Sequence, residues 1–97
     1  MENCSFCKII NKERKAFIIT ENENVIVFLS LENHPLVVPK MHIKDIYELD
    51  EKIGGEIMKE LTMTAMLVKK ALGSEGIYIT QANEKAAGQE VPHIHFH

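Results

Sequence analysis

Three histidines alternate with apolar residues in "HIHFH", the last five residues. Alternate side chains of a β-strand face opposite ways, so His93, His95 and His97 would share one face while Ile94 and Phe96 enter a core. Imidazoles about 6.5 to 7 Å apart along a strand can act on one ligand. The pattern therefore predicts either metal binding or nucleophilic catalysis, with phosphorus as the natural target. A solvated edge strand is the simpler explanation, but the intervening apolar residues favour a half-buried one.

Two cysteines near the start, Cys4 and Cys7, have C-x-x-C spacing. This spacing suits zinc, although a single C-x-x-C without further ligands is a weak signal. A redox dithiol is the alternative, and the sequence around it lacks the βαβ setting of thioredoxin-like motifs. The third interpretation is structural, with two small buried residues on a short helix.

The composition is typical of one globular domain of 97 residues, with 45% hydrophobic and 26% charged residues. The net charge of −3 and the scattered Lys and Arg residues argue against binding of long nucleic acids. No apolar run approaches the roughly 20 residues that span a bilayer, and the start is too polar for a secretory signal. We therefore expect a cytoplasmic protein that does not contact membranes and whose binding partner is a small molecule.

The elements that must position these side chains follow from apolar periodicity. Helix-like spacing predicts a short helix over residues 4–11 that carries both cysteines. Runs of β-branched and aromatic residues predict strands, the first two forming a hairpin with a four-residue loop. The predicted strands are residues 16–20, 25–30, 34–40, 76–80 and 91–97.

One long helix follows the third strand. Its apolar stripe has i, i+4 spacing, Asp50 is placed to cap it and Gly73 to end it. Because Gly54 and Gly55 each weaken a helix by about 1 kcal/mol relative to Ala, we expect its regular part to begin after them. The stripe consists of Ile53, Ile57, Leu61, Ala65, Val68 and Leu72. An antiparallel β-sheet with one long helix and a short N-terminal helix is an α+β domain.

The segment "AAGQEVPHIHFH" resembles the signature of the histidine triad (HIT) superfamily of nucleotide hydrolases and transferases. The resemblance extends upstream through "CSFCKIINKE", "VIVFLSL", "HPLVVPKMHI" and "ANEKAAGQ", which occur in the family's order over nearly all 97 residues. It implies a HIT-like fold and a small purine nucleotide as substrate. The implied reaction is hydrolysis or transfer of a nucleoside monophosphate from a phosphoramidate, a mixed anhydride or a dinucleoside polyphosphate.

The resemblance also assigns roles to individual positions. His95 matches the family's nucleophile, which forms a covalent nucleotidyl-histidine intermediate, and His97 matches a histidine that contacts the phosphate. Asn83 and Gln89 match polar residues near the phosphate and the leaving group. The positions that match the nucleoside pocket are Phe6, Ile9, Phe28, Ser30 and Leu31.

The bacterial-type, zinc-containing branch of the family binds a structural zinc ion through four positions, which here are Cys4, Cys7, His42 and His93. Such a closed Cys₂His₂ shell would tie the N-terminal helix to the sheet and leave no open coordination position for chemistry. Zinc is thus the implied cofactor. His34 has no matching partners, and we expect it to contribute a hydrogen bond at a strand edge.

Two residues and one connection depart from the family's pattern. Ser30 stands where the family has an Asp that accepts hydrogen bonds from both ribose hydroxyls, so Glu32 becomes the fallback acceptor. The connection "SLENHPL" is shorter than the family's and is expected to reshape the pocket wall. Glu90 replaces Ser or Thr, and it could either protonate a leaving group or repel phosphate.

The sequence also ends on His97, where the family continues through a segment that often completes a dimer. We expect a single HIT-like domain over residues 1–97 that lacks this segment, with a terminal carboxylate that opposes anionic substrates and a strand that frays. A homodimer is implied only by the resemblance. The leading hypothesis is a nucleotide hydrolase or transferase, and the alternatives are a catalytically impaired module that binds nucleotide or protein and a redox protein built on the cysteines.

Overall fold

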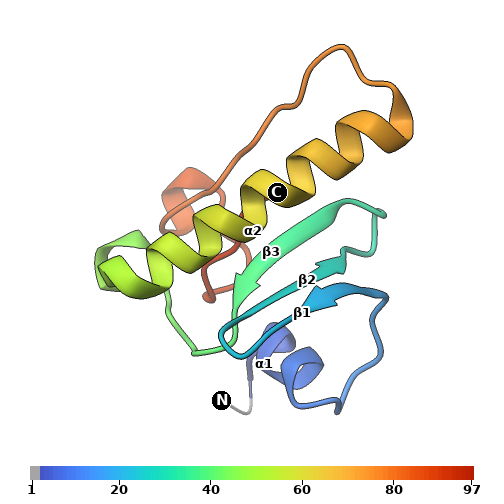
Figure 1. The fold of residues 1–97 in the computed structure, drawn as a ribbon. Coiled ribbons are helices and arrows are strands. Elements are labelled where there is room, and N and C mark those ends of the chain that lie inside the picture. Colours follow the sequence, from blue (N-terminus) through green and yellow to red (C-terminus); the bar gives the residue numbers. More distant parts are fainter. Residues whose placement is uncertain (1–2) are drawn as a thin grey trace.

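The computed structural model of this chain describes residues 3–97, and its α+β architecture matches the expected one. A three-stranded antiparallel sheet lies between a short helix and a long helix (Figure 1). The elements are α1 (Ser5–Ile10), β1 (Ile18–Glu21), β2 (Val25–Leu29), β3 (Pro35–Pro39) and α2 (Glu51–Leu72), with short 3₁₀ turns at Ile46–Glu48 and Lys85–Ala87. No helix in the described part of the chain is long and apolar enough to cross a membrane.

The central strand β2 pairs with β1 on one side and with β3 on the other, in an unbroken register from Val25 opposite Pro39 to Leu29 opposite Pro35. Its first four residues are buried, since both faces of the sheet are covered. The two prolines lie at the ends of β3, where a missing N–H costs the ladder least.

Helix α2 is capped by Asp50 and ended by Gly73, as the sequence predicts. The Asp50 carboxylate accepts a hydrogen bond from the Ile53 N–H at 2.8 Å, and Gly73 ends the helix in the left-handed conformation with φ 61°. The helix is regular from Glu51, so the expectation that it begins after Gly54 and Gly55 is wrong. The cap at Asp50 supports the first turn despite the weak helix propensity of the glycines.

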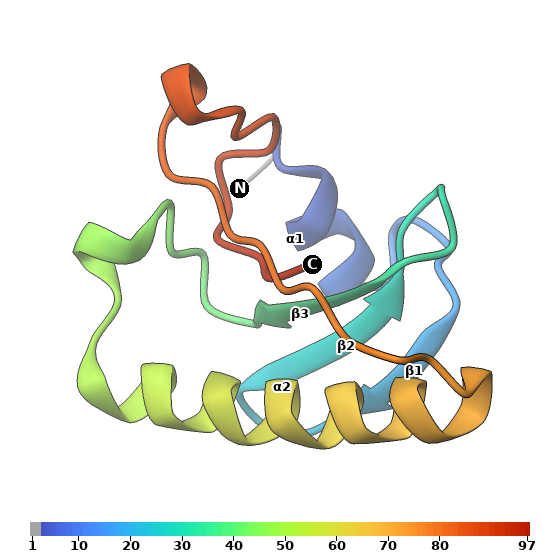
Figure 2. The same cartoon turned by 90° about the horizontal axis from the view of Figure 1, so that it is seen from above.

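The two faces of the sheet belong to two separate cores. Side chains of Ile26, Phe28 and Val38 pack with α1, whereas Val25 and Val27 pack on the opposite face with α2. Figure 2 shows α2 running along one side of the sheet while α1 lies on the other. The α2 core contains Val37, Ile43, Ile53, Ile57, Leu61 and Ile94.

The last two predicted strands do not form regular strands. Residues 76–80 run beside the end of the chain and pair only through Thr80, whose N–H and carbonyl bond to His97. Residues 91–97 join the sheet edge at a single bridge between Phe96 and Val37. Local strand propensity was sufficient to predict extended backbone here, but a ladder requires partners in register along several residues.

Ile57 tests the α2 core. This side chain is 1% exposed, so Ile57→Ala should lower the free energy of unfolding by about 2–5 kcal/mol through lost burial and a residual cavity. The matched control is Met58→Ala on the same helix, whose side chain is 55% exposed and whose removal should change stability by less than about 0.5 kcal/mol. Urea denaturation of both variants measures the difference, and equal losses would contradict this account of the core.

Candidate functional site

The C-terminal segment keeps the alternation of a strand although it has no regular ladder. Ile94 is fully buried in the α2 core, and its N–H donates to the Ile43 carbonyl at 2.7 Å. His93 and His95 are buried on the other side, where both rings lie edge-on to Phe6 of α1. The pleat thus separates imidazoles from apolar residues as the sequence predicts.

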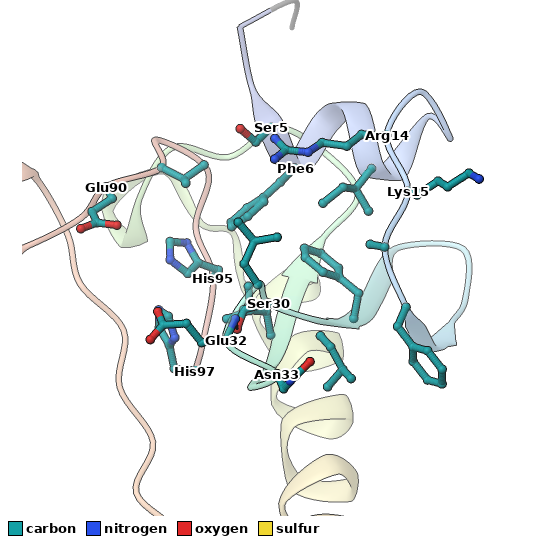
Figure 3. A pocket seen from close by; sticks show the side chains of 18 of the residues that line it. Ser5, Phe6, Arg14, Lys15, Ser30, Glu32, Asn33, Glu90, His95 and His97 are labelled. Atoms are coloured by element: carbon teal, nitrogen blue, oxygen red, sulfur yellow. Dashed lines mark hydrogen bonds between the residues drawn. The ribbon is translucent and has the colours of Figure 1, made fainter.

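A cavity of about 690 Å³ opens in front of His95 and His97 (Figure 3). Its walls come from α1, the connection before β1, the end of β2 with the following turn, and the loop before the histidines. Of the predicted site residues, the apolar side chains of Phe6, Ile9, Phe28 and Leu31 line it, as do Ser30, His95 and His97. The lining therefore combines a group of apolar side chains with two imidazoles.

The His95 ring is held in one orientation. Its Nδ1 lies 2.8 Å from the His93 carbonyl oxygen, which can only accept, so Nδ1 carries the proton. In the neutral ring Nε2 is then the unprotonated nitrogen. Burial lowers the pKa of His95 from its ordinary value, an effect that the bond to the His93 carbonyl partly opposes. The buried environment therefore favours the nucleophilic, neutral form.

His97 is exposed at the cavity edge, with its ring centre 5.0 Å from that of His95 and an interplanar angle of 62°. Figure 3 shows it among the labelled cavity-lining side chains, together with His95, Glu32 and Glu90. Both imidazoles line the cavity, so one ligand of moderate size can contact the two rings together.

Cys4, Cys7, His42 and His93 meet behind the cavity, with their ligand atoms all within 4.8 Å of one another. Cys4 Sγ lies 3.3 Å from His93 Nδ1, and Cys7 Sγ lies 3.3 Å from His42 Nδ1 and 3.6 Å from His93 Nδ1. A tetrahedral zinc ion with bonds of about 2.3 Å to sulfur and 2.0 Å to nitrogen separates these ligand atoms by about 3.5 Å. The four residues fit a metal ion of this kind.

The tautomer and the charge of the His93 ring suit a metal ligand. Its Nε2 donates to the Pro39 carbonyl oxygen at 2.8 Å, which leaves the Nδ1 lone pair facing the thiols. Burial lowers the pKa of His93 to about 4, so the ring stays neutral. Cys4 and Cys7 are free thiols, and two imidazoles beside them favour a metal site over a redox dithiol.

Asn83 and Gln89 lie outside the cavity lining, and their amides bond to loops. The Gln89 Oε1 accepts from the Glu84 N–H and its Nε2 donates to the Lys44 carbonyl oxygen, both at 2.7 Å. The Asn83 Oδ1 accepts from the Ile46 N–H at 2.8 Å. These bonds give both amides a structural part in shaping the loop that carries Gly88 and Glu90 to the cavity.

The short connection after β2 is a tight turn organised by Ser30. Its Oγ accepts from the Glu32 N–H at 3.2 Å and the His34 N–H at 3.1 Å, while Asn33 adopts φ 62°. The strand-edge hydrogen bond expected of His34 is thus made by its main chain. The turn places Glu32 and Asn33 in the cavity lining.

Sequence reasoning missed several polar residues of the cavity. Ser5, Arg14, Lys15 and Asn33 line it, and in Figure 3 the Arg14 guanidinium points toward Ser5 while Lys15 points away. Arg14 and Lys15 belong to the irregular connection between α1 and β1. Nothing in the sequence spacing marks Arg14 and Lys15 as site residues. They reach the cavity because the connection between α1 and β1 runs back along it.

Comparison with known proteins supports the resemblance to the HIT family. The HIT domain family model matches residues 11–97. An uncharacterized HIT-like protein of Methanocaldococcus jannaschii is 41% identical over 98 residues, covering 97% of this chain and 75% of that protein. An adenosine 5′-monophosphoramidase of Saccharomyces cerevisiae is 33% identical, covering 97% and 60%. The crystal structure of a HIT family protein from Bacillus anthracis superposes with a TM-score of 0.95 at 34% identity, covering 99% and 71%.

The Gln89 amide provides a test of its structural part. Gln89→Ala leaves the Lys44 carbonyl and the Glu84 N–H without their partner, so the free energy of unfolding should fall by about 1–3 kcal/mol. Glu90→Ala changes the exposed neighbouring side chain and should stay within about 0.5 kcal/mol. Urea denaturation compares the two, and a Gln89 variant as stable as the parent would contradict this role.

Proposed function

Because this chain belongs to the HIT domain family, we propose that it is a nucleotide hydrolase or nucleotidyl transferase with His95 as its nucleophile. Its substrates are nucleoside phosphoramidates, mixed anhydrides or dinucleoside polyphosphates. The observation that carries the proposal is the His95 ring, whose Nδ1 is bonded to a carbonyl while the ring lines a nucleotide-sized cavity. The name of the yeast relative, an adenosine 5′-monophosphoramidase, supports the substrate class.

In the proposed reaction, the lone pair of His95 Nε2 forms a bond to the phosphorus atom. The bond from phosphorus to the leaving group breaks, and its electron pair departs on the leaving atom, which takes up a proton from solvent. His97 contacts a phosphate oxygen and offsets its charge during this step. The oxygen of a water molecule then bonds to phosphorus and the water gives up a proton to solvent. The N–P bond breaks with its electron pair returning to His95 Nε2, and the nucleoside monophosphate and neutral imidazole are released.

The nucleoside is proposed to occupy the apolar part of the cavity, between Phe6 and Ile9 of α1 and Phe28 of β2. Ser30 Oγ already accepts two main-chain hydrogen bonds within its turn. The neighbouring Glu32 carboxylate, which lines the same wall, is therefore our candidate acceptor for the ribose hydroxyls. Asn83 and Gln89 support this pocket by fixing the loop behind it.

A second candidate function is nucleotide binding without turnover. Glu90 lines the cavity, and a carboxylate near the phosphate opposes an anionic ligand. This module would bind a purine nucleotide in calorimetry while leaving a phosphoramidate unhydrolysed.

His95→Ala separates these two functions. Turnover of adenosine 5′-monophosphoramidate should fall roughly a thousandfold or more, because the residue that forms the covalent bond is lost. Rapid acid quenching followed by mass spectrometry should detect adenylate on His95 of the parent protein. His34→Ala is the matched control, since this imidazole is exposed and lies outside the active-site cavity, and it should keep parental turnover. Equal rates for the parent and His95→Ala would refute the assigned nucleophile.

We further propose that Cys4, Cys7, His42 and His93 hold a structural zinc ion. Their two thiols and two Nδ1 atoms supply a full tetrahedral set, which leaves no position for substrate. Bound zinc would contribute folding free energy by joining α1 to the C-terminal segment. The cluster itself takes no part in the proposed bond making.

Zinc removal should therefore lower stability. Metal-replete protein should contain about one zinc per chain, and restoring zinc to one hundred times its dissociation constant should stabilise the fold by about 2.7 kcal/mol. Elemental analysis and thermal denaturation with and without a chelator measure both quantities. His34→Ala should behave like the parent, whereas Cys7→Ser should bind zinc more weakly. A metal content well below roughly half an equivalent would rule out the proposed site.

We also propose that two copies of this chain pair and that the protein is cytoplasmic. The exposed side chains of Leu72, Ile77, Tyr78 and Ile79 lie close in sequence at the end of α2 and after it, and they support pairing of two chains. A cytoplasmic location agrees with two free thiols. A single domain over residues 1–97 likewise stays a prediction.

A further inference from the structure

We propose that His93 is a positioning residue that couples the metal cluster to the nucleophile. Its side chain belongs to the cluster, while its main-chain carbonyl oxygen accepts the hydrogen bond from His95 Nδ1. This inference rests on the proposed function for the role of His95, and it goes beyond a metal that only stabilises the fold. In it, occupancy of the cluster determines which nitrogen of His95 carries the proton.

The His93 ring is anchored on both sides. Nδ1 lies 3.3 Å from Cys4 Sγ, and Nε2 donates to the Pro39 carbonyl oxygen at the end of β3 at 2.8 Å. The residue is fully buried. Since the ring is fixed at both nitrogens, the main chain of residue 93 follows the position of the cluster.

The peptide group between His93 and Ile94 is fixed by two further hydrogen bonds close to the cluster. On one side its carbonyl oxygen accepts from His95 Nδ1, and on the other its N–H donates to the Ile43 carbonyl oxygen at 2.7 Å. Ile43 directly follows His42, the fourth member of the cluster. The carbonyl of this peptide group therefore belongs to one cluster residue, His93, and the acceptor of its N–H is the neighbour of another, His42.

Ladder pairing does not replace these contacts. The main-chain pairing of the segment with β3 is the bridge between Phe96 and Val37, and the His93 N–H bonds locally to the Val91 carbonyl. In a regular strand, main-chain hydrogen bonds of the neighbouring residues would hold residue 93 in place. Here its side chain holds it, through the contacts of the ring nitrogens. Loss of the cluster contacts should therefore allow the carbonyl to turn.

Helix α1 provides a parallel connection. Cys4 caps the helix and Cys7 lies in its first turn, while Phe6 between them contacts the His95 ring edge-on at 5.0 Å between ring centres. Phe6 also lines the cavity. A cluster that holds the start of α1 thus places one wall of the cavity against the nucleophile.

The test observes the His95 ring directly by ¹⁵N NMR of the imidazole nitrogens, at about pH 8 where an ordinary imidazole is neutral. Zinc-loaded parent protein should show the form protonated at Nδ1. After removal of zinc by a chelator, at a temperature where circular dichroism shows folded protein, the form protonated at Nε2 should increase. Adding zinc back should reverse the change.

The matched variants are His93→Ala and His42→Ala, each of which removes one imidazole from the cluster. His93→Ala should show the mixed His95 signal with or without zinc, and its turnover should fall about 10- to 100-fold. His42→Ala retains the ring of residue 93, so at saturating zinc it should recover the parental His95 signal. An unchanged His95 signal in zinc-free parent protein would overturn the proposal.

These readouts separate the inference from the proposed function. If the parent protein hydrolyses no phosphoramidate, the proposed function fails while the His95 signal still reports the coupling. If His93→Ala does not fold, zinc removal from the parent protein remains decisive, because it changes no residue. A His95 signal that follows zinc in the parent but is normal in His93→Ala would assign the coupling to α1 and contradict the role of His93.

Discussion

Contacts of the buried His93 ring connect parts of the chain that lie far apart in sequence. Through its two nitrogens the ring contacts the thiols at the start of α1 and the carbonyl of Pro39 at the end of β3. Its main chain belongs to the segment that carries His95. Since this segment has only one bridge to the sheet, the geometry of the cavity depends on a side chain as much as on backbone pairing.

The division between chemistry and support follows from the pleat. His93 and His95 face the α1 side, whereas Ile94 enters the core beneath α2. Burial of the apolar residues fixes how closely the segment lies against the sheet. The alternation of side chains then points the imidazoles toward Phe6 and the cavity. This explains how a segment without a ladder can place the rings of His95 and His97 with their centres 5.0 Å apart.

Local sequence signals predicted the elements with strong periodicity, because their determinants lie within a few residues. Asp50, Gly73 and the apolar stripe define α2, and runs of β-branched and aromatic residues predict the hairpin. Alternation predicts the side to which His95 points. The strand pairing of residues 76–80 and 91–97 depends on partners far away in the sequence, so local sequence patterns could not predict it. The same holds for Arg14, which reaches the cavity through an irregular connection, and for Gln89, whose amide donates to the carbonyl of Lys44, 45 residues away. The cluster of Cys4 with His93 was accessible only through family resemblance, since nothing in the spacing joins residues 89 apart.

The two-core arrangement has a consequence for how this protein can diverge. Residues beneath α2 share no cluster with those around Phe6 and Phe28, because the strands of the sheet stand between them. Substitutions of α2 residues such as Ile57 or Leu61 can alter thermal tolerance while the sheet separates them from the cavity, whereas Ile94 of the same core directly precedes His95. On the α1 side the same residues form both hydrophobic core and cavity wall, so evolution has far less freedom there to change one without the other.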